Sequence, residues 1–340
     1  MNVRNKFTCL MMIHLLVLIL ILSGCARVFG NNDATTIRVA NNLGIAHPSH
    51  DSLEEFSTLI AKNTDGAMEL EIFPNGMLGG ERNVIEMIQA GVLEFSRVSA
   101  GALEAFNEAY QIFSLPYVFH SQEHFHSVMN YSEAVQDIFM STEDQRFIAI
   151  GWMDAGQRSI YLREDIKVTS PEDLNGISIR VMESPTTIEM IRLMGGVATP
   201  MPFGEVYTGL QQGIIDGAEN NETALTLSGH GEVTGSYTFT EHQFTPDIII
   251  VSTRFWNDLT IEEQEMFRDI ARQVSKSHIE RWNESVLEAV TISEQEMGVN
   301  FYHIDKTPFI EATAPMREEF VARNERNRYI MENFLSFLNE

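Results

Sequence analysis

Cysteine is almost absent from this sequence, whose 340 residues contain only Cys9 and Cys25. Both precede the part of the chain in which strand and helix patterns alternate, so no pair is left there to form a disulfide. The folded part must therefore be stabilised by its hydrophobic core. About 315 residues are ample for such a core, divided between two domains.

Positive charge is also scarce. The chain has 23 lysines and arginines against 48 aspartates and glutamates, which gives a formal net charge of -25. A nucleic-acid partner is excluded, because phosphate binding needs a basic face. An anionic ligand would have to be held by local positive charge against this acidic background.

The signatures of common enzyme classes are missing too: there is no G-x-S-x-G elbow, P-loop, G-x-G-x-x-G after a strand, or H-E-x-x-H helix. His47 and His50 form an H-x-x-H pair, but on a proline-containing loop without a nearby carboxylate pair. Helix capping or loop packing is expected of them. We therefore predict a protein that is not an enzyme and has neither a metal site nor a cofactor.

The first residues have the plan of a secretory signal. Arg4 and Lys6 precede an apolar run over 10–22, which His14 alone interrupts and which ends at Leu22-Ser23-Gly24-Cys25. This run is well short of the ~20 residues that a membrane-spanning helix needs. Gly24-Cys25 resembles a bacterial lipobox, although an uncleaved anchor with a chance cysteine is the alternative.

The lipobox implies that the signal peptide, residues 1–24, is removed and that Cys25 carries a lipid. Loss of Arg4 and Lys6 takes the formal net charge from -25 to -27. Residues 25–36 read as a tether. The predicted location is extracytoplasmic, anchored by lipid to the cell membrane, in the periplasm or on the outer face of the membrane.

Strand and helix patterns alternate along the rest of the chain. Strands are predicted at 37–41, 68–73, 147–152, 159–163 and 177–181, and helices at 51–63, 81–90 and 186–194. This order indicates an α/β architecture with mainly parallel sheets.

One segment is unusually long. From Thr260 to Glu296 no proline or glycine interrupts the helical pattern, and Thr260 with Glu263 forms a capping box. At 1.5 Å per residue this helix would be ~55 Å long, more than the diameter of a small domain. We expect it to cross from one domain to the other, unless an unmarked kink divides it in two.

Two arginines are placed in or next to predicted strands. Arg180 lies inside the apolar strand 177–181, and Arg158 in the turn before the strand 159–163. A buried guanidinium needs a partner, because an unpaired buried charge is costly. That partner could be a ligand carboxylate, which the guanidinium matches with two parallel hydrogen bonds. The alternative for Arg180, which the residues alone favour, is an internal ion pair, for instance with Glu183 or Glu219.

Asn220 and Asn221 follow Asp216-Gly-Ala-Glu219 at the carboxyl end of another short strand. Ligands of open α/β sheets gather at such strand ends. The two amides are therefore candidate ligand contacts.

Several stretches resemble, in the same order, the DctP family of solute-binding proteins of TRAP (tripartite ATP-independent periplasmic) transporters. They are residues 73–82, 114–119, 170–176, 180–185 and 200–220. The resemblance, which runs from about Ile37 to beyond Tyr302, implies a two-lobed, periplasmic-binding-protein-like (Venus flytrap) fold with a long helix spanning both lobes. It also implies ion-driven uptake through separate small and large membrane subunits.

The same resemblance suggests roles for individual residues. Arg180 matches the arginine that binds the substrate carboxylate, and Arg158 a second anion contact. Asn220 matches an asparagine that hydrogen-bonds the ligand, Glu81 an acidic residue that accepts from ligand hydroxyls, and Phe203 an aromatic residue that lines the pocket.

One departure from the family pattern narrows the ligand. Many members read Q-E-N-P where this chain reads Ala218-Glu-Asn-Asn221, so that a proline has become a second amide. This variant is similar to members that bind sugar acids, particularly hexuronates. Glu183 would help to read hydroxyls, and Arg97 would add to the site unless it is a surface strand residue.

The predicted function is that of a monomeric receptor that captures a sugar acid by hinge closure and delivers it to TRAP membrane subunits. The alternatives are a receptor for a C4-dicarboxylate, a ligand sensor, and a sugar-acid hydrolase that uses Glu81 and Glu183. Lobe I is predicted to comprise 37–155 and 245–280, and lobe II 156–244 and 281–340. The long helix, about 260–297, crosses both.

Overall fold

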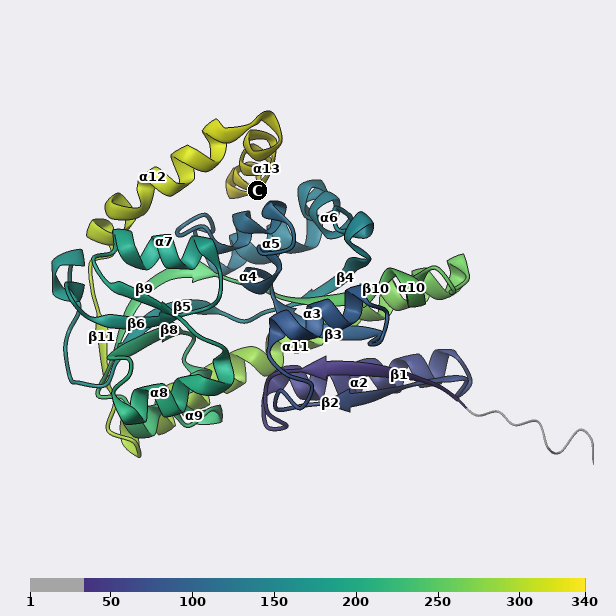
Figure 1. Ribbon diagram of the computed structural model, residues 1–340, viewed down its shortest axis with the longest axis horizontal. Coiled ribbons are helices and arrows are strands. Elements are labelled where there is room, and N and C mark those ends of the chain that lie inside the picture. Colours follow the sequence, from purple (N-terminus) through teal and green to yellow (C-terminus); the bar gives the residue numbers. More distant parts are fainter. Residues whose placement is uncertain (1–33, 340) are drawn as a thin grey trace, which may run out of the picture.

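The computed structural model describes residues 34–339, which form two β-sheets flanked by helices (Figure 1). The first sheet has the order β2-β1-β3-β10-β4. Its strands are β1 (Thr35–Asn41), β2 (Met68–Phe73), β3 (Phe95–Ser99), β4 (Phe147–Met153) and β10 (Asp247–Ser252). The second sheet has the order β11-β9-β5-β8-β6-β7. Its strands are β5 (Gln157–Leu162), β6 (Ser178–Val181), β7 (Val197–Pro200), β8 (Gly217–Asn220), β9 (Ser236–Phe244) and β11 (Asn300–His303).

Helices pack around both sheets. The α-helices are α2 (Pro48–Asn63), α3 (Glu81–Gln89), α4 (Ala100–Leu103), α5 (Gln122–Tyr131), α6 (Glu133–Met140), α7 (Pro185–Leu193), α8 (Val206–Gln212), α9 (Thr223–Leu227), α10 (Thr253–Trp256), α11 (Ile261–Gln295), α12 (Thr307–Arg323) and α13 (Glu325–Ser336). The 3₁₀ helices are η1 (Glu108–Ser114), η2 (Glu143–Gln145), η3 (Pro171–Leu174), η4 (Phe203–Glu205), η5 (His230–Val233) and η6 (Phe337–Asn339). In this part of the chain no helix is both long and apolar enough to cross a membrane.

The predicted α/β architecture is confirmed, but the sheets are mixed rather than mainly parallel. In the first sheet β1 runs parallel to β2 and β3, whereas β10 runs antiparallel to both β3 and β4. In the second sheet β5 is antiparallel to β8 and β9. The cause is the route of the chain: it leaves the first sheet along β4 and returns along β10, so these two strands must point in opposite directions.

Three segments carry the chain between the sheets: residues 154–156, residues 245–246 and α11. Gly156 has a positive φ of 64°, and a Cβ there would lie 2.9 Å from the indole of Trp282 on α11. On the same helix, the His278 Nε2 bonds to the carbonyl oxygen of Asp154 at 2.8 Å. The long helix is thus packed against the neighbouring crossing segment.

Helix α11 confirms the expectation of one long helix that spans both lobes. It runs for 35 residues, and both hydrogen bonds of the capping box between Thr260 and Glu263 are present. It packs against α2 and β4 beside the first sheet and against α9 beside the second. Figure 1 shows it reaching from the first sheet to the region of α8 and α9.

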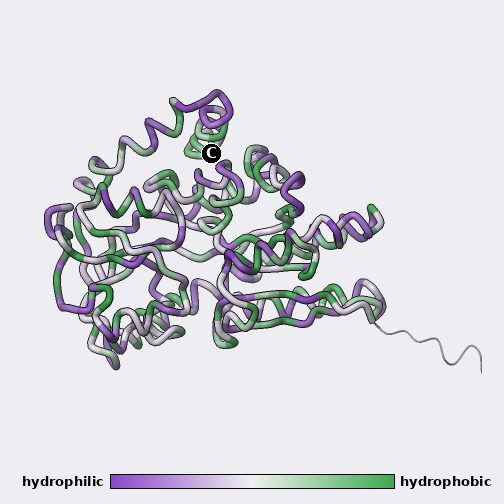
Figure 2. Tube along the Cα trace, viewed as in Figure 1, coloured by the Kyte–Doolittle hydropathy of each residue, from purple (hydrophilic) through white to green (hydrophobic). Residues whose placement is uncertain are grey.

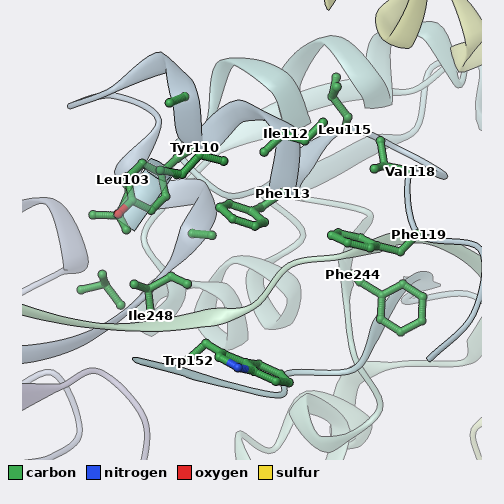
Figure 3. Packing of buried hydrophobic residues seen from close by; sticks show 14 of the residues in the cluster. Leu103, Tyr110, Ile112, Phe113, Leu115, Val118, Phe119, Trp152, Phe244 and Ile248 are labelled. Carbon is green, nitrogen blue, oxygen red and sulfur yellow. The ribbon is translucent and has the colours of Figure 1, made fainter. Parts of the chain in front are cut away.

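The largest hydrophobic cluster draws residues from both halves. Figure 3 shows Phe113, Trp152 and Ile248 in it, and Ile160 and Ile179 of the second sheet belong to the same cluster. The C-terminal helices continue this connection, because α12 contacts α7 and β9 while α13 contacts α6 and η1. The turn between these helices is a hydrophilic stretch at the top of the molecule (Figure 2). The lobe boundaries drawn from the sequence stay a prediction.

A carboxyl group lies at one contact between the halves. Glu104, which follows α4, accepts hydrogen bonds from Ser184 Oγ at 2.9 Å and from Thr186 Oγ1 at 2.7 Å, at the start of α7. Burial raises the pKa of Glu104 to about 7, although these hydroxyl groups oppose the shift. The raised pKa means that the folded protein binds a proton here more tightly than the unfolded chain does.

We therefore predict that Glu104 makes stability fall as the pH rises. Its contribution is fully present below the unfolded pKa of 4.5 and is lost as the pH approaches about 7. Glu104→Gln keeps a neutral acceptor, so its melting temperature should fall less between pH 5 and pH 8 than that of the wild type. Calorimetry at both pH values checks this, with the exposed Glu108→Gln as the control. Equal pH dependence in all three proteins would contradict the prediction.

Candidate functional site

A cavity of about 310 Å³ is lined by residues from both halves of the molecule. The carboxyl ends of β1, β2 and β3 and those of β6 and β8 lead into its lining loops. All of the predicted ligand-binding residues line it, namely Glu81, Arg97, Arg158, Arg180, Glu183, Phe203, Asn220 and Asn221. The structure therefore brings together residues that are up to 140 positions apart in the sequence.

Arg158 is held by an internal ion pair. It lies within β5 rather than in the turn predicted, and its Nε and Nη2 donate to the two carboxylate oxygens of Glu219 on β8, at 2.6 and 2.9 Å. Its Nη2 also donates to the backbone oxygen of Glu219, and Nη1 donates to Asn220 Oδ1 at 2.8 Å. Of the five N–H groups of this guanidinium, residues 34–339 leave only one on Nη1 for a ligand.

Burial alone would raise the pKa of Glu219, but the charge of Arg158, with help from His242, lowers it to about 2. Glu219 is therefore ionised at any physiological pH. The internal ion pair that the sequence allowed for Arg180 is formed by Arg158 instead.

Arg180 on β6 has a different environment. Its Nε and Nη2 both donate to the backbone oxygen of Met201, at 2.9 and 2.7 Å, and its guanidinium lies 5.8 Å from the ring centre of Phe203. Burial lowers the pKa of Arg180, with Glu219 opposing this and Arg158 adding to it. Within residues 34–339 Arg180 forms no ion pair. It is a buried cation whose Nη1 is directed to no protein acceptor in that range.

The two asparagines differ in what they leave free. Asn220 Oδ1 accepts from Arg158 and from the backbone N–H of Asn221, so its Nδ2 remains for a ligand. Asn221 donates to the carbonyl oxygen of Ala155 at 3.0 Å and accepts from Thr223 Oγ1 at 2.7 Å. It thereby ties the start of α9 to the crossing segment between the sheets.

Residues of the first half form the opposite side of the cavity. Arg97 on β3 is only 5% exposed, so the alternative of a surface residue is wrong. It donates through Nη1 to Asn42 Oδ1 at 2.6 Å and to Glu81 at 3.4 Å, and its Nη2 forms an ion pair with Asp247. Glu81, at the start of α3, also accepts from the Ser99 N–H at 2.8 Å. The charge of Arg97 is thus paired with carboxylates of the protein, Glu81 and Asp247.

The two sides of the cavity carry opposite charge. We name Glu81, Arg97 and Asp247 the first wall, with two carboxylates and one cation. Arg158, Arg180 and Glu219 form the second wall, with two cations and one carboxylate. An anionic group of a ligand is therefore attracted to the second wall, and hydroxyl groups that donate hydrogen bonds suit the first.

The sequence-based prediction missed Asn42 and Asp247, which both line the cavity. Asp247 begins an apolar strand directly after a proline, and a carboxylate at such a strand end was the available signal. His47 also lines the cavity, while its Nδ1 accepts from the Ser49 N–H at 3.2 Å and caps α2, as expected. Over the described range no group of three or more His, Cys, Asp or Glu side chains could hold a metal ion. Cys25 lies outside that range.

Known proteins resemble this chain over most of its length. Residues 39–324 match the DctP family, described as bacterial extracellular solute-binding protein, family 7. The uncharacterized protein YiiZ of Salmonella typhimurium is 38% identical over 271 residues, which are 80% of this chain and 83% of that protein. A solute-binding protein of Chromohalobacter salexigens is 32% identical over 277 residues, which are 81% of this chain and 82% of that protein.

Solved structures of TRAP periplasmic solute-binding proteins share the fold. One, from Anaerococcus prevotii with bound α/β-D-glucuronate, has a TM-score of 0.87 and 38% identity, and the match covers 90% of this chain and 98% of that one. Another, from Xanthobacter autotrophicus with bound β-D-galacturonate, has a TM-score of 0.83 and 30% identity, covering 88% and 98%. These similarities confirm the predicted two-lobed fold.

The Arg158–Glu219 pair predicts a large effect on stability. Glu219→Gln leaves Arg158 buried without a charged partner, which typically costs about 3–5 kcal/mol. Because the pKa of Glu219 is lowered, the wild type should also lose this contribution as the pH falls from 4.5 toward 2.

Urea unfolding at pH 7 checks the substitution. Glu189→Gln is the matched control, since Glu189 forms an exposed ion pair with Arg192 on α7. Such surface pairs contribute only about 0–1 kcal/mol. A cost at Glu219 no greater than that at Glu189 would contradict the assigned role.

Proposed function

The chain belongs to the DctP family, bacterial extracellular solute-binding protein family 7, and from this premise we propose that it is a receptor that captures a hexuronate outside the cytoplasm. The observation that carries the proposal is Arg180, a buried cation in the cavity that forms no ion pair within residues 34–339. A ligand carboxylate would supply the missing negative charge. The glucuronate and galacturonate bound by the two similar solved proteins support a sugar acid as that ligand.

The proposed pose follows from the charges of the walls. The carboxylate lies against Arg180, within reach of the remaining N–H of Arg158 and the Nδ2 of Asn220. The sugar hydroxyls point to Glu81, and Phe203 covers one face of the ring. The other predicted binding residues lie next to these contacts. Arg97 donates a hydrogen bond to Glu81, and the backbone N–H of Asn221 donates one to Asn220, so both residues hold a ligand contact in place. Glu183 is exposed and would reach the ligand from the edge of the cavity.

Capture by hinge closure fits this arrangement, because contacts from both lobes stabilise the closed state. We propose that residues 154–156 and 245–246 and α11 form the hinge, between lobes divided as the sequence predicts: 37–155 with 245–280, and 156–244 with 281–340. The closed receptor, a monomer, then delivers its ligand unchanged to the small and large TRAP membrane subunits. The lipid on Cys25 keeps it at the membrane.

Arg180→Ala should weaken binding of D-glucuronate on the order of a hundredfold or more, since loss of one buried charge partner typically costs about 3–5 kcal/mol. Arg180→Lys should also bind poorly, because an ammonium group cannot make two parallel hydrogen bonds to a carboxylate. Calorimetric titration measures both. The exposed Arg192→Ala is the control and should bind like the wild type. An affinity of Arg180→Ala within threefold of the wild type would reject this role for Arg180.

Cys25→Ser should abolish lipid attachment, because only the thiol of this residue could carry the lipid. Expressed with its own signal in a bacterial host, the wild type should enter the membrane fraction and incorporate labelled fatty acid. The variant should incorporate none. Cys9→Ser is the matched control, since Cys9 lies within the predicted signal peptide. Labelling of Cys25→Ser at the wild-type level would contradict the predicted anchor.

A further inference from the structure

Asp247 has a place in the cavity that the sequence motifs did not predict. It is the first residue of β10, opposite Ser99 of β3 and Met153 of β4, and it is only 2% exposed. It lines the cavity together with Glu81 and forms an ion pair with Arg97. Two carboxylates of the first wall therefore share a single buried cation.

We propose that Asp247 and Glu81 make the first wall a charge filter, which admits a hydroxylated ligand with one carboxylate and rejects a ligand with a second carboxylate at its other end. The proposal rests on the proposed function, because it takes Arg180 as the partner of the first carboxylate. The rejected class comprises sugar diacids (aldarates) and C4-dicarboxylates. Asp247 is thereby a specificity-determining residue.

The charge filter requires that the first wall has no positive charge left to pair with a second ligand carboxylate. Arg97 meets this condition by charge, since Nη2 pairs with Asp247 while Nη1 donates to Asn42 and Glu81, so that two carboxylates share its one positive charge. Its Nε is buried and finds no hydrogen-bond partner in residues 34–339, so it too is closed to a ligand. A second carboxylate on this side would meet protein carboxylates.

The remaining basic groups of the cavity do not change this balance. Burial holds the pKa of His47 well below its ordinary value, with the charge of Arg97 adding to the effect, so this imidazole is neutral. Arg82 lines the cavity, but its side chain is 61% exposed and paired with Glu86. A charge in such contact with water is screened and compensates little for repulsion at a buried wall.

The two walls also act on each other across the cavity. Burial lowers the pKa of Arg180, and the negative charge of Glu81 opposes this shift. Burial raises the pKa of Asp247 to about 6, although the charges of Arg97 and Arg158 oppose the shift, so Asp247 is ionised at pH 7.5. One ligand carboxylate gives the second wall the negative charge it lacks. The first wall already has an excess of negative charge, so a second carboxylate finds repulsion where a hydroxyl finds an acceptor.

The decisive comparison uses two open-chain sugar acids of the same length, D-gluconate with one carboxylate and D-glucarate with two. Calorimetric titration at pH 7.5 should show that the wild type binds glucarate at least tenfold more weakly than gluconate. In Asp247→Asn this ratio should shrink to less than threefold, because the first wall then has one carboxylate for one cation. Glu81→Gln should narrow the ratio for the same reason, and it replaces the first variant if Asp247→Asn does not fold.

Asp137→Asn is the matched control. It makes the same change in net charge on the exposed face of α6 and should keep the wild-type ratio. D-Glucuronate, titrated in parallel, separates the two hypotheses. If none of the three acids binds, the proposed function fails. If glucuronate binds, but glucarate binds as tightly as gluconate or the ratio is unchanged in the cavity variant that folds, the charge filter is overturned.

Discussion

A single carboxylate, Glu219, stands between two buried arginines, and the chemistry of the cavity depends on this imbalance. Both oxygens of Glu219 accept hydrogen bonds from Arg158, so that among the described residues Arg180 donates only to the carbonyl oxygen of Met201. A buried cation without a counter-charge is costly. The folded protein therefore lacks one negative charge beside Arg180. A carboxylate ligand supplies that charge, so its binding stabilises the buried guanidinium.

The unpaired positive charge lies in the cavity between the two sheets, beside the proposed hinge. The second wall lies on strands β5, β6 and β8, and the first wall on β3, α3 and β10, so a ligand held by both must join the two sheets. The segments that carry the chain across run beside the cavity, and Asn221 donates directly to Ala155 in one of them. A contact at the ligand is therefore also a contact at the proposed hinge.

Structural features that depend on residues close together in the sequence were predictable. Contacts that depend on which strands pair were not. The capping box and the lack of glycine and proline predicted α11, and a family resemblance placed Arg180 in the cavity. Which arginine takes Glu219 depends on the pairing of β5 with β8, which no local pattern reveals. The ion pair of Arg97 with Asp247 likewise depends on β3 meeting a strand about 150 residues later. The mixed strand directions have the same origin.

The position of β10 also has a consequence for biosynthesis. β10 lies between β3 and β4, so the first sheet lacks the strand that joins β4 to the other strands until residue 252 has been synthesised. By then every strand of the second sheet except β11 has been made. The first sheet therefore cannot be completed until about three quarters of the chain has been made. A late-closing topology keeps the nascent chain unfolded for longer, which is the state that a secretion channel accepts.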